Sequence, residues 1–420
     1  MKISDSEKNL NKQYFWNLIG TISSTLISIV LLFIVSRLTS AKMADVFSIA
    51  FTLGQQFLVI GLFGVRNYQS TDMREQHTFS SYFFSRILTT LLMILFGIVY
   101  IISIGLNGEK FWIILFMILY RSCDAFSDVF QGYFQQQQRS DLSGKVLFYR
   151  SVLTILFFPI LLILFDNLLI VTFGIFILNF SMIFILDFNY LSRYFKLSLL
   201  KDNFDFRNSI SILKFCIPLF IGSFLINYIY NDPKIIIDSF ITKGQFRAGM
   251  QRDFNVLFMP TFVMNLLLLI LRPMLTELSI VWYKGEKSVY DQRVRKLFVI
   301  LSCLNIGILL GGYFLGIPLL SLVFGIDLSP YLLPFIILLM GGGFNVYSVL
   351  IDNLLTIHRK QHYLLVVTVL TFLFSKLIMV NLISRYEIAG AAIGFTLTMF
   401  VYFLLSIVTY VIIRKFVTEK

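Results

Sequence analysis

The chain has 420 residues, of which 57% are hydrophobic and only 14% are charged, and its mean hydropathy is +0.82. A soluble protein of this length needs far more polar surface, so the composition excludes a soluble globular class. The net charge of +12 does not predict nucleic-acid binding, because the basic residues are dispersed among the connections between apolar segments. The sequence therefore predicts a membrane protein.

Apolar segments long enough to cross the ~30 Å hydrocarbon core recur along the whole chain. Stretches such as 27–35 and 156–164 are apolar on every side, whereas the strands of a membrane barrel alternate. Because backbone amides in lipid must be satisfied internally, these runs are predicted to be helices. The fold class is thus an all-α polytopic membrane protein with about 12 transmembrane helices. In chain order, the predicted spans are 14–36, 44–66, 82–104, 111–133, 147–165, 168–188, 211–231, 254–275, 297–325, 329–354, 363–384 and 388–413.

The spans divide into two predicted six-helix bundles, residues 1–200 and 201–420, separated by the long basic segment 189–210. The other long connection is 276–296. With both termini in the cytoplasm, most lysines and arginines fall on the cytoplasmic side, as the positive-inside rule requires. Arg86 and Arg150 are counted on that side. We therefore expect both termini in the cytoplasm.

Two spans at corresponding positions of the halves share a pattern. Span 44–66 opens at Asp45 and ends at Arg66, and span 254–275 follows Asp253 and contains Arg272. Since ~20 residues of helix cross the bilayer core, both arginines are expected near the cytoplasmic side. Halves of six spans each form parallel repeats, a plan typical of transporters with a pathway between two bundles. The alternative is chance similarity between apolar helices.

One predicted helix carries polar and charged side chains on a single face. Arg121, Asp124, Asp128, Gln131 and Gln135 recur at steps of three and four residues, which places them in one stripe. Ionisable groups within spans usually face a bundle interior or a water-filled cavity. The stripe is either an internal salt bridge of Arg121 with one of the two aspartates or the lining of a cavity. The glutamines favour the cavity.

The arginines of the matched spans also have two interpretations. Arg66 and Arg272 either extend to the lipid headgroups or face a cavity. Their matched positions favour the cavity, as does the polar run after Arg66, which includes Asn67 and Gln69.

Three further polar residues within spans are ambiguous. Lys376 lies in the middle of span 363–384, with Asp352 as a candidate partner. Asn17 in the first span either lines the same pathway or joins one helix to another.

Motifs for catalysis and for cofactors are missing from the sequence. No G-x-x-x-x-G-K-[ST] loop occurs, so ATP hydrolysis by this chain is not predicted, and we expect no cofactor and no metal. The main enzyme alternative is an integral-membrane glycosyltransferase or polysaccharide polymerase. It is disfavoured because the outer connections are short, and the longest, 232–253, has no D-x-D pair.

Several segments carry a resemblance to a known family. These are Trp-Asn-Leu-Ile-Gly at 16–20, the turn Ser-Arg-Leu-Thr at 36–39, Phe-Ser-Ile-Ala-Phe at 47–51, and Phe-Cys-Ile-Pro-Leu-Phe-Ile-Gly at 215–222. Together with the twelve-span plan they resemble the polysaccharide-transporter branch of the MATE/MOP exporter superfamily. Its members include the Wzx-type flippases, which move undecaprenyl-pyrophosphate-linked oligosaccharides. The family's glycine in the first turn is absent, because Ser-Ala-Lys stands at 40–42.

The resemblance implies a non-enzymatic flippase of the bacterial plasma membrane that serves O-antigen, capsule or cell-wall glycan synthesis. Its implied partners are the lipid-linked oligosaccharide and membrane lipids, with a polymerase and glycosyltransferases acting beside it. Arginine suits the pyrophosphate because its planar guanidinium donates two hydrogen bonds at once. On this hypothesis of alternating access, Arg66 and Arg272 receive the pyrophosphate, and Arg121 with its stripe carries it onward.

Asp124, Asp128 and Asp352 are the candidates for coupling transport to an ion gradient. The nearest alternative is a multidrug exporter of the same superfamily, which favours cationic, apolar cargo in an acidic and aromatic pocket. The basic balance of the charges within the spans favours an anionic substrate instead.

Overall fold

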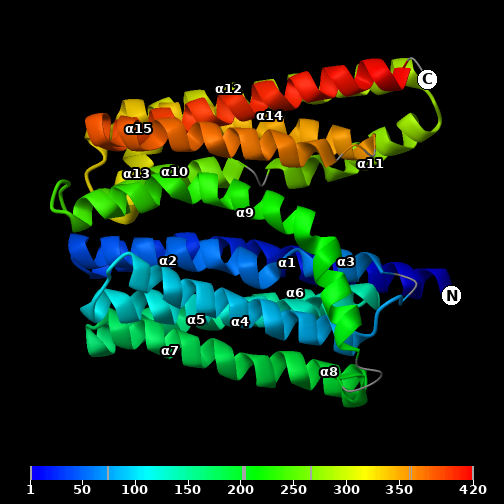
Figure 1. The fold of residues 1–420 in the computed structure, drawn as a ribbon, viewed down its shortest axis with the longest axis horizontal. Coiled ribbons are helices and arrows are strands. Elements are labelled where there is room, and N and C mark those ends of the chain that lie inside the picture. Colours follow the sequence, from blue (N-terminus) through cyan, green and yellow to red (C-terminus); the bar gives the residue numbers. More distant parts are fainter. Residues whose placement is uncertain are drawn as a thin grey trace. The chain divides into compact units, whose positions relative to one another are not determined.

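The computed structural model describes residues 2–72, 75–200, 205–264, 267–358, 360 and 362–418, and every regular element in these ranges is a helix. The chain divides into two compact units, Met1–Phe224 (unit 1) and Leu225–Lys420 (unit 2). The division falls within α9 (Phe206–Thr242) (Figure 1). The predicted all-α class is confirmed, whereas the division at 200/201 and the cytoplasmic termini stay predictions.

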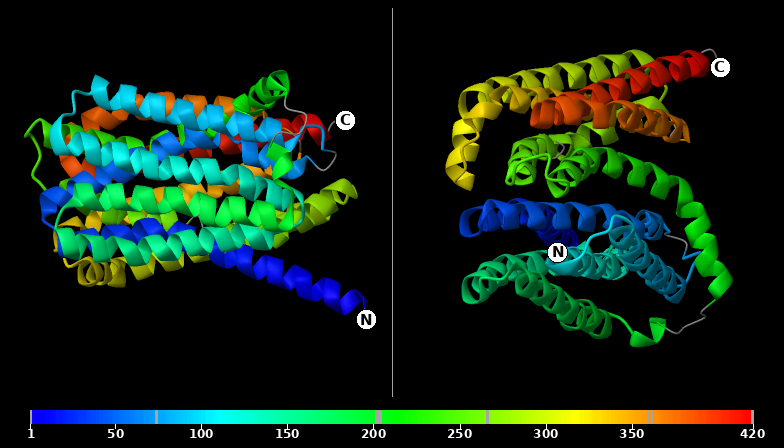
Figure 2. Two further views of the ribbon diagram at one scale, coloured as in Figure 1. Left: turned by 90° about the horizontal axis from the view of Figure 1, so that it is seen from below. Right: turned by 60° about the vertical axis from the view of Figure 1, so that its left-hand side comes forward.

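Unit 1 consists of long helices joined by short connections, and α5 lies at its centre. This helix packs against α2, α3, α4, α6 and α7, while α1 packs chiefly on α6 (Figure 2). The elements before α9 are α1 (Lys2–Leu38), α2 (Ala41–Leu62), α3 (Val65–Thr71), α4 (Phe79–Ser103), α5 (Gly108–Gln136), α6 (Ser140–Phe165), α7 (Leu168–Met182), the π-helix η1 (Ile183–Phe188), α8 (Asn189–Tyr194) and the 3₁₀-helix η2 (Leu197–Leu200).

The predicted span 44–66 is interrupted before it reaches Arg66. Phe63 and Gly64 have φ angles of 48° and 71°, in the left-handed region that ends a helix. Helix α2 therefore ends at Leu62, and Arg66 belongs to the short helix α3. The interruption frees the carbonyl of Gly61, the group that residue 65 would bond in a continuous helix.

Helices α1 and α6 approach each other through two glycines. A Cβ atom on Gly20 would lie 2.2 Å from the carbonyl oxygen of Gly144, and one on Gly144 would lie 2.1 Å from the carbonyl oxygen of Trp16. Only residues without side chains permit such backbone contact. This crossing holds α1 closely against α6.

Unit 2 is organised around α14, which packs against α10, α11, α12 and α15. Glu387 has a non-helical φ of 51°, which divides α15 between the predicted spans 363–384 and 388–413. The elements after α9 are α10 (Met250–Met264), α11 (Leu267–Tyr283), α12 (Lys287–Gly311), the π-helix η3 (Gly312–Gly316), α13 (Ile317–Phe324), the 3₁₀-helix η4 (Ser329–Tyr331), α14 (Leu332–Ile357) and α15 (His362–Thr418).

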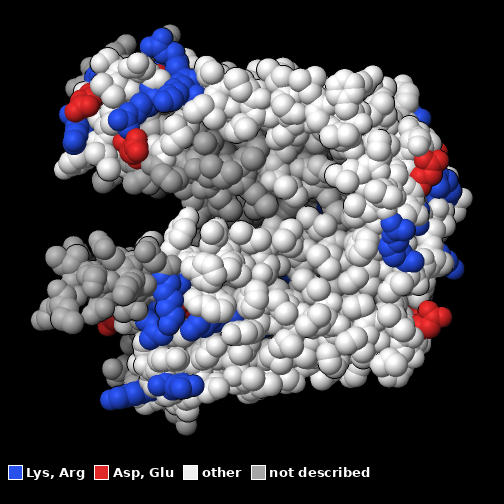
Figure 3. All heavy atoms as spheres, turned by 180° about the vertical axis from the view of Figure 1, so that it is seen from behind, with Lys and Arg blue, Asp and Glu red and all other residues white. Residues whose placement is uncertain are grey.

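Hydropathy identifies membrane-crossing helices in both units. Within the described ranges, nine helical segments are long and apolar enough to cross a membrane, and the segment His362–Arg414 covers two predicted spans. Helix α5 is not among them because it carries charged residues. On the face drawn in Figure 3, charged side chains gather toward the helix ends, and the surface between them is largely uncharged.

Two predicted connections are largely helical. Helix α9 continues to Thr242, so Asp232 lies within a helix and not in an outer loop, and α11 continues to Tyr283. The structure thus differs from the predicted connection 232–253 over 232–242, which is helical, while the span bounds themselves stay predictions. Asp232 is instead only 1% exposed and forms an ion pair with Lys376.

Candidate functional site

The polar stripe of α5 forms the centre of a network of side chains inside unit 1. Helix α5 buries most of its second half, including Arg121, Asp128 and Gln131, whose exposed fractions are 5%, 6% and 2%. Residues from α3, α4, α6 and η1 complete the network. We call it the α5 polar network, and it comprises Arg66, Arg86, Arg121, Asp124, Ser127, Asp128, Gln131, Gln135, Arg150 and Asp187.

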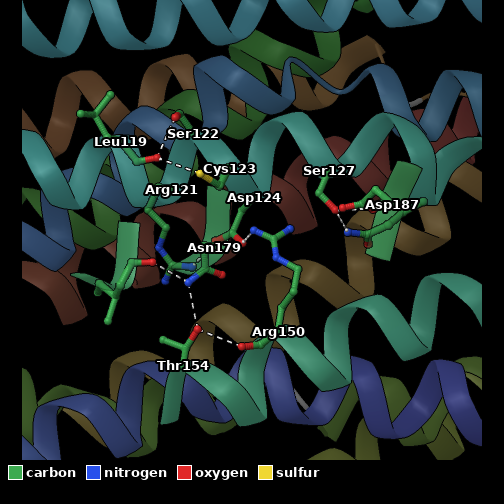
Figure 4. Close-up of polar contacts among 12 residues, drawn as sticks. Leu119, Arg121, Ser122, Cys123, Asp124, Ser127, Arg150, Thr154, Asn179 and Asp187 are labelled. Carbon is green, nitrogen blue, oxygen red and sulfur yellow. Dashed lines mark hydrogen bonds and ion pairs between the residues drawn. The ribbon is translucent and has the colours of Figure 1, made fainter. Parts of the chain in front are cut away.

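The first aspartate of the stripe is shared by two arginines. Asp124 accepts from Arg121 of the same helix at 2.7 Å, and Arg150 of α6 lies 3.0 Å from its other oxygen (Figure 4). The guanidinium of Arg121 also lies over the ring of Phe51, 4.5 Å from its centroid. The predicted salt bridge of Arg121 is therefore made with Asp124 and not with Asp128.

The second aspartate, one helical turn later, repeats this arrangement with two other arginines. Arg66 of α3 donates to Asp128 Oδ1 at 3.0 Å, and Arg86 of α4 donates to Asp128 Oδ2 at 2.7 Å. Arg86 is completely buried, whereas the side chain of Arg66 is 25% exposed. Each aspartate of α5 thus holds one arginine on each carboxylate oxygen.

Hydrogen bonds extend the network toward η1. Gln131 accepts from Arg66 at 3.0 Å through its amide oxygen and donates to Ser127 at 3.1 Å through its amide nitrogen. Ser127 in turn donates to Asp187 at 2.9 Å (Figure 4). Gln135 accepts from Arg66 Nε at 3.2 Å. Arg66 is therefore surrounded by three oxygen acceptors of α5.

Several guanidinium nitrogens of the network are buried with no hydrogen-bond partner within the described ranges. These are Nε of Arg86, Nε and Nη2 of Arg121, and Nε of Arg150. Asp187 also has one carboxylate oxygen in this state. Because a buried donor without an acceptor is costly, the network combines surplus donor capacity with surplus positive charge. Such a site favours anions over cations.

The other predicted site residues of unit 1 differ in burial and in what they contact. Gln69 is fully buried beside α5, with its amide oxygen 2.4 Å from where a Cβ on Gly132 would lie. Asn67 is exposed. Asn17 is half-buried on α1, close to Gly144 at the crossing with α6, which favours its interpretation as a packing residue.

The predicted polar pair of unit 2 is not formed. Lys376 donates to Asp232 at 2.6 Å and to the hydroxyl of Tyr228 at 2.7 Å, both on α9, and not to Asp352. Asp352 instead accepts hydrogen bonds from Tyr402 and, at 3.4 Å, from Ser406. The pairing was mispredicted because sequence does not show which helix faces which.

Arg272 of α11 is the counterpart that the sequence assigns to Arg66. Its side chain lies outside the residues that the structure describes. Its proposed role at the cytoplasmic side stays a prediction.

Four members of the network were not predicted as site residues: Arg86, Ser127, Arg150 and Asp187. The positive-inside count placed the two arginines among cytoplasmic charges, because both lie near the ends of apolar segments. A usable signal exists for Arg86. It follows Ser81 and Ser85 and precedes Thr89, so hydroxyl and charged groups share one face of α4, and all are buried.

A separate aromatic cluster lies near one end of α14 in unit 2. The ring of His358 stacks on Trp282 of α11 with centroids 4.1 Å apart, and its Nε2 lies 3.0 Å from the hydroxyl of Tyr290 of α12. Burial, with a contribution from the positive charge of Arg414, lowers the pKa of His358 from 6.5 to about 4. The ring is therefore neutral near pH 7 and joins three helix ends.

Comparison with known proteins gives one relative in sequence and several in structure. The sequence matches no family model. It is 22% identical over 398 residues to the capsular polysaccharide biosynthesis protein CapF of Staphylococcus aureus, which covers 93% of this chain and 96% of that protein. Among solved structures, an inward-facing multidrug resistance MATE family transporter of the MOP superfamily has a TM-score of 0.72 at 10% identity, covering 96% of this chain and 99% of that one.

Two further transporters share the fold. A mutant of the MATE transporter VcmN of Vibrio cholerae has a TM-score of 0.63 at 16% identity, covering 99% of this chain and 98% of that one. A MOP superfamily transporter of Pyrococcus furiosus has a TM-score of 0.64 at 14% identity, covering 98% and 96%.

These likenesses show that the chain has the fold of MATE and MOP superfamily transporters, and its apolar helices indicate a multi-pass membrane protein. In fold the chain is similar to transporters of the MOP superfamily, and in sequence it is similar to a capsular polysaccharide biosynthesis protein. The predicted MOP/MATE-like fold is confirmed.

Proposed function

We propose that this protein is a flippase that moves undecaprenyl-pyrophosphate-linked oligosaccharides from the cytoplasmic to the outer leaflet for cell-surface polysaccharide synthesis. Transport proceeds by alternating access, with the prenyl tail remaining in lipid. The pyrophosphate with its sugars is anionic and strongly hydrated, so its passage requires fixed positive charge within the protein.

The observation that carries this proposal is the charge balance of the α5 polar network. Its four arginines outnumber its three aspartates, and several guanidinium nitrogens are buried without an acceptor within the described ranges. Arginine is suited to phosphate oxygens because it stays charged and its donors match their geometry. Such a surplus of positive charge would repel the cationic substrates of a multidrug exporter.

The relative in sequence also supports a role in cell-surface polysaccharide synthesis. CapF is a capsular polysaccharide biosynthesis protein, and the likeness spans nearly the full length of both chains. A flippase is the transport step that such a pathway requires when repeat units are assembled on a lipid in the cytoplasm and polymerised outside. A polymerase and glycosyltransferases are then the functional partners.

The test follows lipid-linked oligosaccharides in cells that lack this protein. We expect undecaprenyl-linked repeat units to accumulate on the cytoplasmic leaflet, where an impermeant reagent added outside cannot reach them. Complementation should succeed with the wild type and fail with Arg66→Ala combined with Arg272→Ala. Arg193→Ala is the matched control, because Arg193 is an exposed arginine of α8 that contacts no member of the network.

Two results would change the proposal in different ways. Unchanged lipid-linked pools together with altered efflux of cationic dyes would replace the flippase with a multidrug exporter. Full rescue by the double variant, with accumulation in the deletion strain, would keep the function and remove these two arginines from the substrate site.

A further inference from the structure

The two arginines that share Asp128 differ in their exposure and in their hydrogen-bond partners, which together decide whether a ligand can reach them. Arg86 is completely buried, and its two terminal nitrogens are both occupied, one by Asp128 and one by the carbonyl of Gly61. Arg66 has a quarter of its side chain exposed, and its hydrogen bonds within the described part of the chain go to side chains of α5. An anion that enters the network from solvent therefore meets Arg66 first.

Arg86 is fixed by the interruption between α2 and α3. The left-handed residues Phe63 and Gly64 leave the carbonyl of Gly61 without a partner from its own helix. Arg86 donates to this carbonyl, and Thr89 donates to it at 2.8 Å. A cation at the C-terminal end of a helix is also favoured by the helix dipole. Arg86 thus serves as a permanent cap of α2.

The acceptors around Arg66 resemble those that a phosphate group would supply. One carboxylate oxygen and two amide oxygens lie between 3.0 and 3.2 Å from its nitrogens. Ser127 holds the amide nitrogen of Gln131, which turns the amide oxygen toward Arg66. Loss of Arg66 to a ligand would leave Asp128 Oδ2 paired with Arg86, so the carboxylate is never buried without a counter-charge.

We propose that Asp128 is an internal competitor of the anionic substrate: Arg66 exchanges Asp128 Oδ1 for a phosphate oxygen, while Arg86 retains Asp128 in place. Arg86 is a positioning residue and does not touch the substrate. The inference rests on the proposed function for the identity of the ligand, a phosphate or pyrophosphate group.

The test measures binding of inorganic pyrophosphate to the full-length purified protein by isothermal titration calorimetry. Asp128→Asn keeps an oxygen acceptor but removes the competing charge, so we expect pyrophosphate to bind about tenfold more tightly. Arg86→Gln leaves Asp128 with Arg66 as its remaining arginine, so binding should weaken about tenfold. The combined variant should bind at least as tightly as the wild type.

This rescue separates positioning from a merely structural role. If Arg86 only supported the fold, removing the charge of Asp128 would not restore binding to the Arg86→Gln variant. Unchanged or weaker binding by Asp128→Asn would overturn the proposal. Should that variant fail to fold, Gln135→Ala removes a competing acceptor from a half-buried position and should tighten binding about twofold, because Arg66 loses one acceptor. No change in that variant would likewise overturn it.

A second arm identifies the source of the anion. Undecaprenyl pyrophosphate in the same detergent should displace inorganic pyrophosphate from the wild type but not from Arg66→Ala. Failure of displacement would refute the assignment to a lipid headgroup. The proposed function is judged separately by accumulation of lipid-linked oligosaccharide in cells, so a negative result there leaves the binding measurements interpretable.

Discussion

Helices α5 and α14 each lie at the centre of their own unit, yet their interiors are opposite in character. Helix α5 holds Asp124 and Asp128 in ion pairs with arginines of α3, α4 and α6. Helix α14 has Gly341 and Gly342 at its packing face, and hydroxyls of neighbouring helices bond directly to its backbone. Thr261 donates to the carbonyl of Leu338 at 3.2 Å.

The difference shows that burying charge is not needed to build the centre of such a bundle. Close backbone approach does so in α14, where a Cβ on Gly342 would lie 2.9 Å from both Met264 and Thr261. Buried ion pairs rarely add stability over apolar packing, because desolvation offsets the attraction. The proposed function, in which unit 1 binds an anionic substrate, accounts for the charges of α5.

The largest loss of stability is expected when one buried arginine of the α5 polar network is removed. Arg150→Leu should lower the free energy of unfolding by about 3 kcal/mol, the lower end for a broken buried ion pair, because Arg121 still pairs with Asp124. Unfolding by SDS in mixed micelles measures the change. Arg139→Leu breaks a partly exposed pair with Asp141 and should cost less than about 1 kcal/mol. Equal losses of unfolding free energy in the two variants would mean that the burial of Arg150 does not increase the contribution of its ion pair to stability.

The second-largest loss of stability is expected from a bulky residue at the packing face of α14. Gly342→Leu forces α10 away from α14 and should cost about 2 kcal/mol by overpacking. Gly307→Leu on α12 is the control, since a Cβ there meets nothing within 4 Å. The same unfolding assay applies to both, and a harmless Gly342→Leu would show that α14 tolerates separation from its neighbours.

Loss of the Asp352 carboxylate of α14 should lower the free energy of unfolding less than loss of a charged group of the α5 polar network. Asp352→Asn retains an acceptor for the hydroxyls of Tyr402 and Ser406, so the expected loss is about 1 kcal/mol or less. Asn also fills the same space. A loss as large as that of Arg150→Leu would place Asp352 in a charge network like that of unit 1 and remove the contrast between the units.

The smallest effect concerns pH. Because the pKa of His358 is about 4 in the folded protein and near 6.5 when unfolded, its contribution to stability is complete above pH 6.5 and is lost as pH falls toward 4. The thermal midpoint should therefore decline slightly between pH 7 and 6. His358→Gln should flatten this decline, and an unaltered pH profile in that variant would exclude the histidine as its cause.

The sequence was sufficient for the fold because hydropathy acts over whole segments. Single residues caused the errors. Asp232 falls in the predicted connection 232–253, yet it lies within a helix and forms an ion pair with Lys376 of another helix. The interruption of span 44–66 depends on two left-handed residues, of which Phe63 gives no signal.

The α5 stripe was predictable because it lies on one helix, where spacing alone defines a face. Its partners Arg86, Arg150 and Asp187 were not, because they come from three other elements whose facing surfaces depend on packing. The positive-inside rule used to predict the topology also led to the two arginines being missed, since it counts every arginine near a span end as lying outside the membrane.

The glycine crossing of α1 and α6 has a consequence for biosynthesis. Helix α1 is synthesised well before its main packing partner α6, which begins only at Ser140, after α2, α4 and α5 have been made. At about 10 residues per second, translation leaves α1 without that partner for on the order of 10 s. During this interval the backbone around Gly20 faces lipid or a membrane insertase, so the order of synthesis runs against the order of assembly.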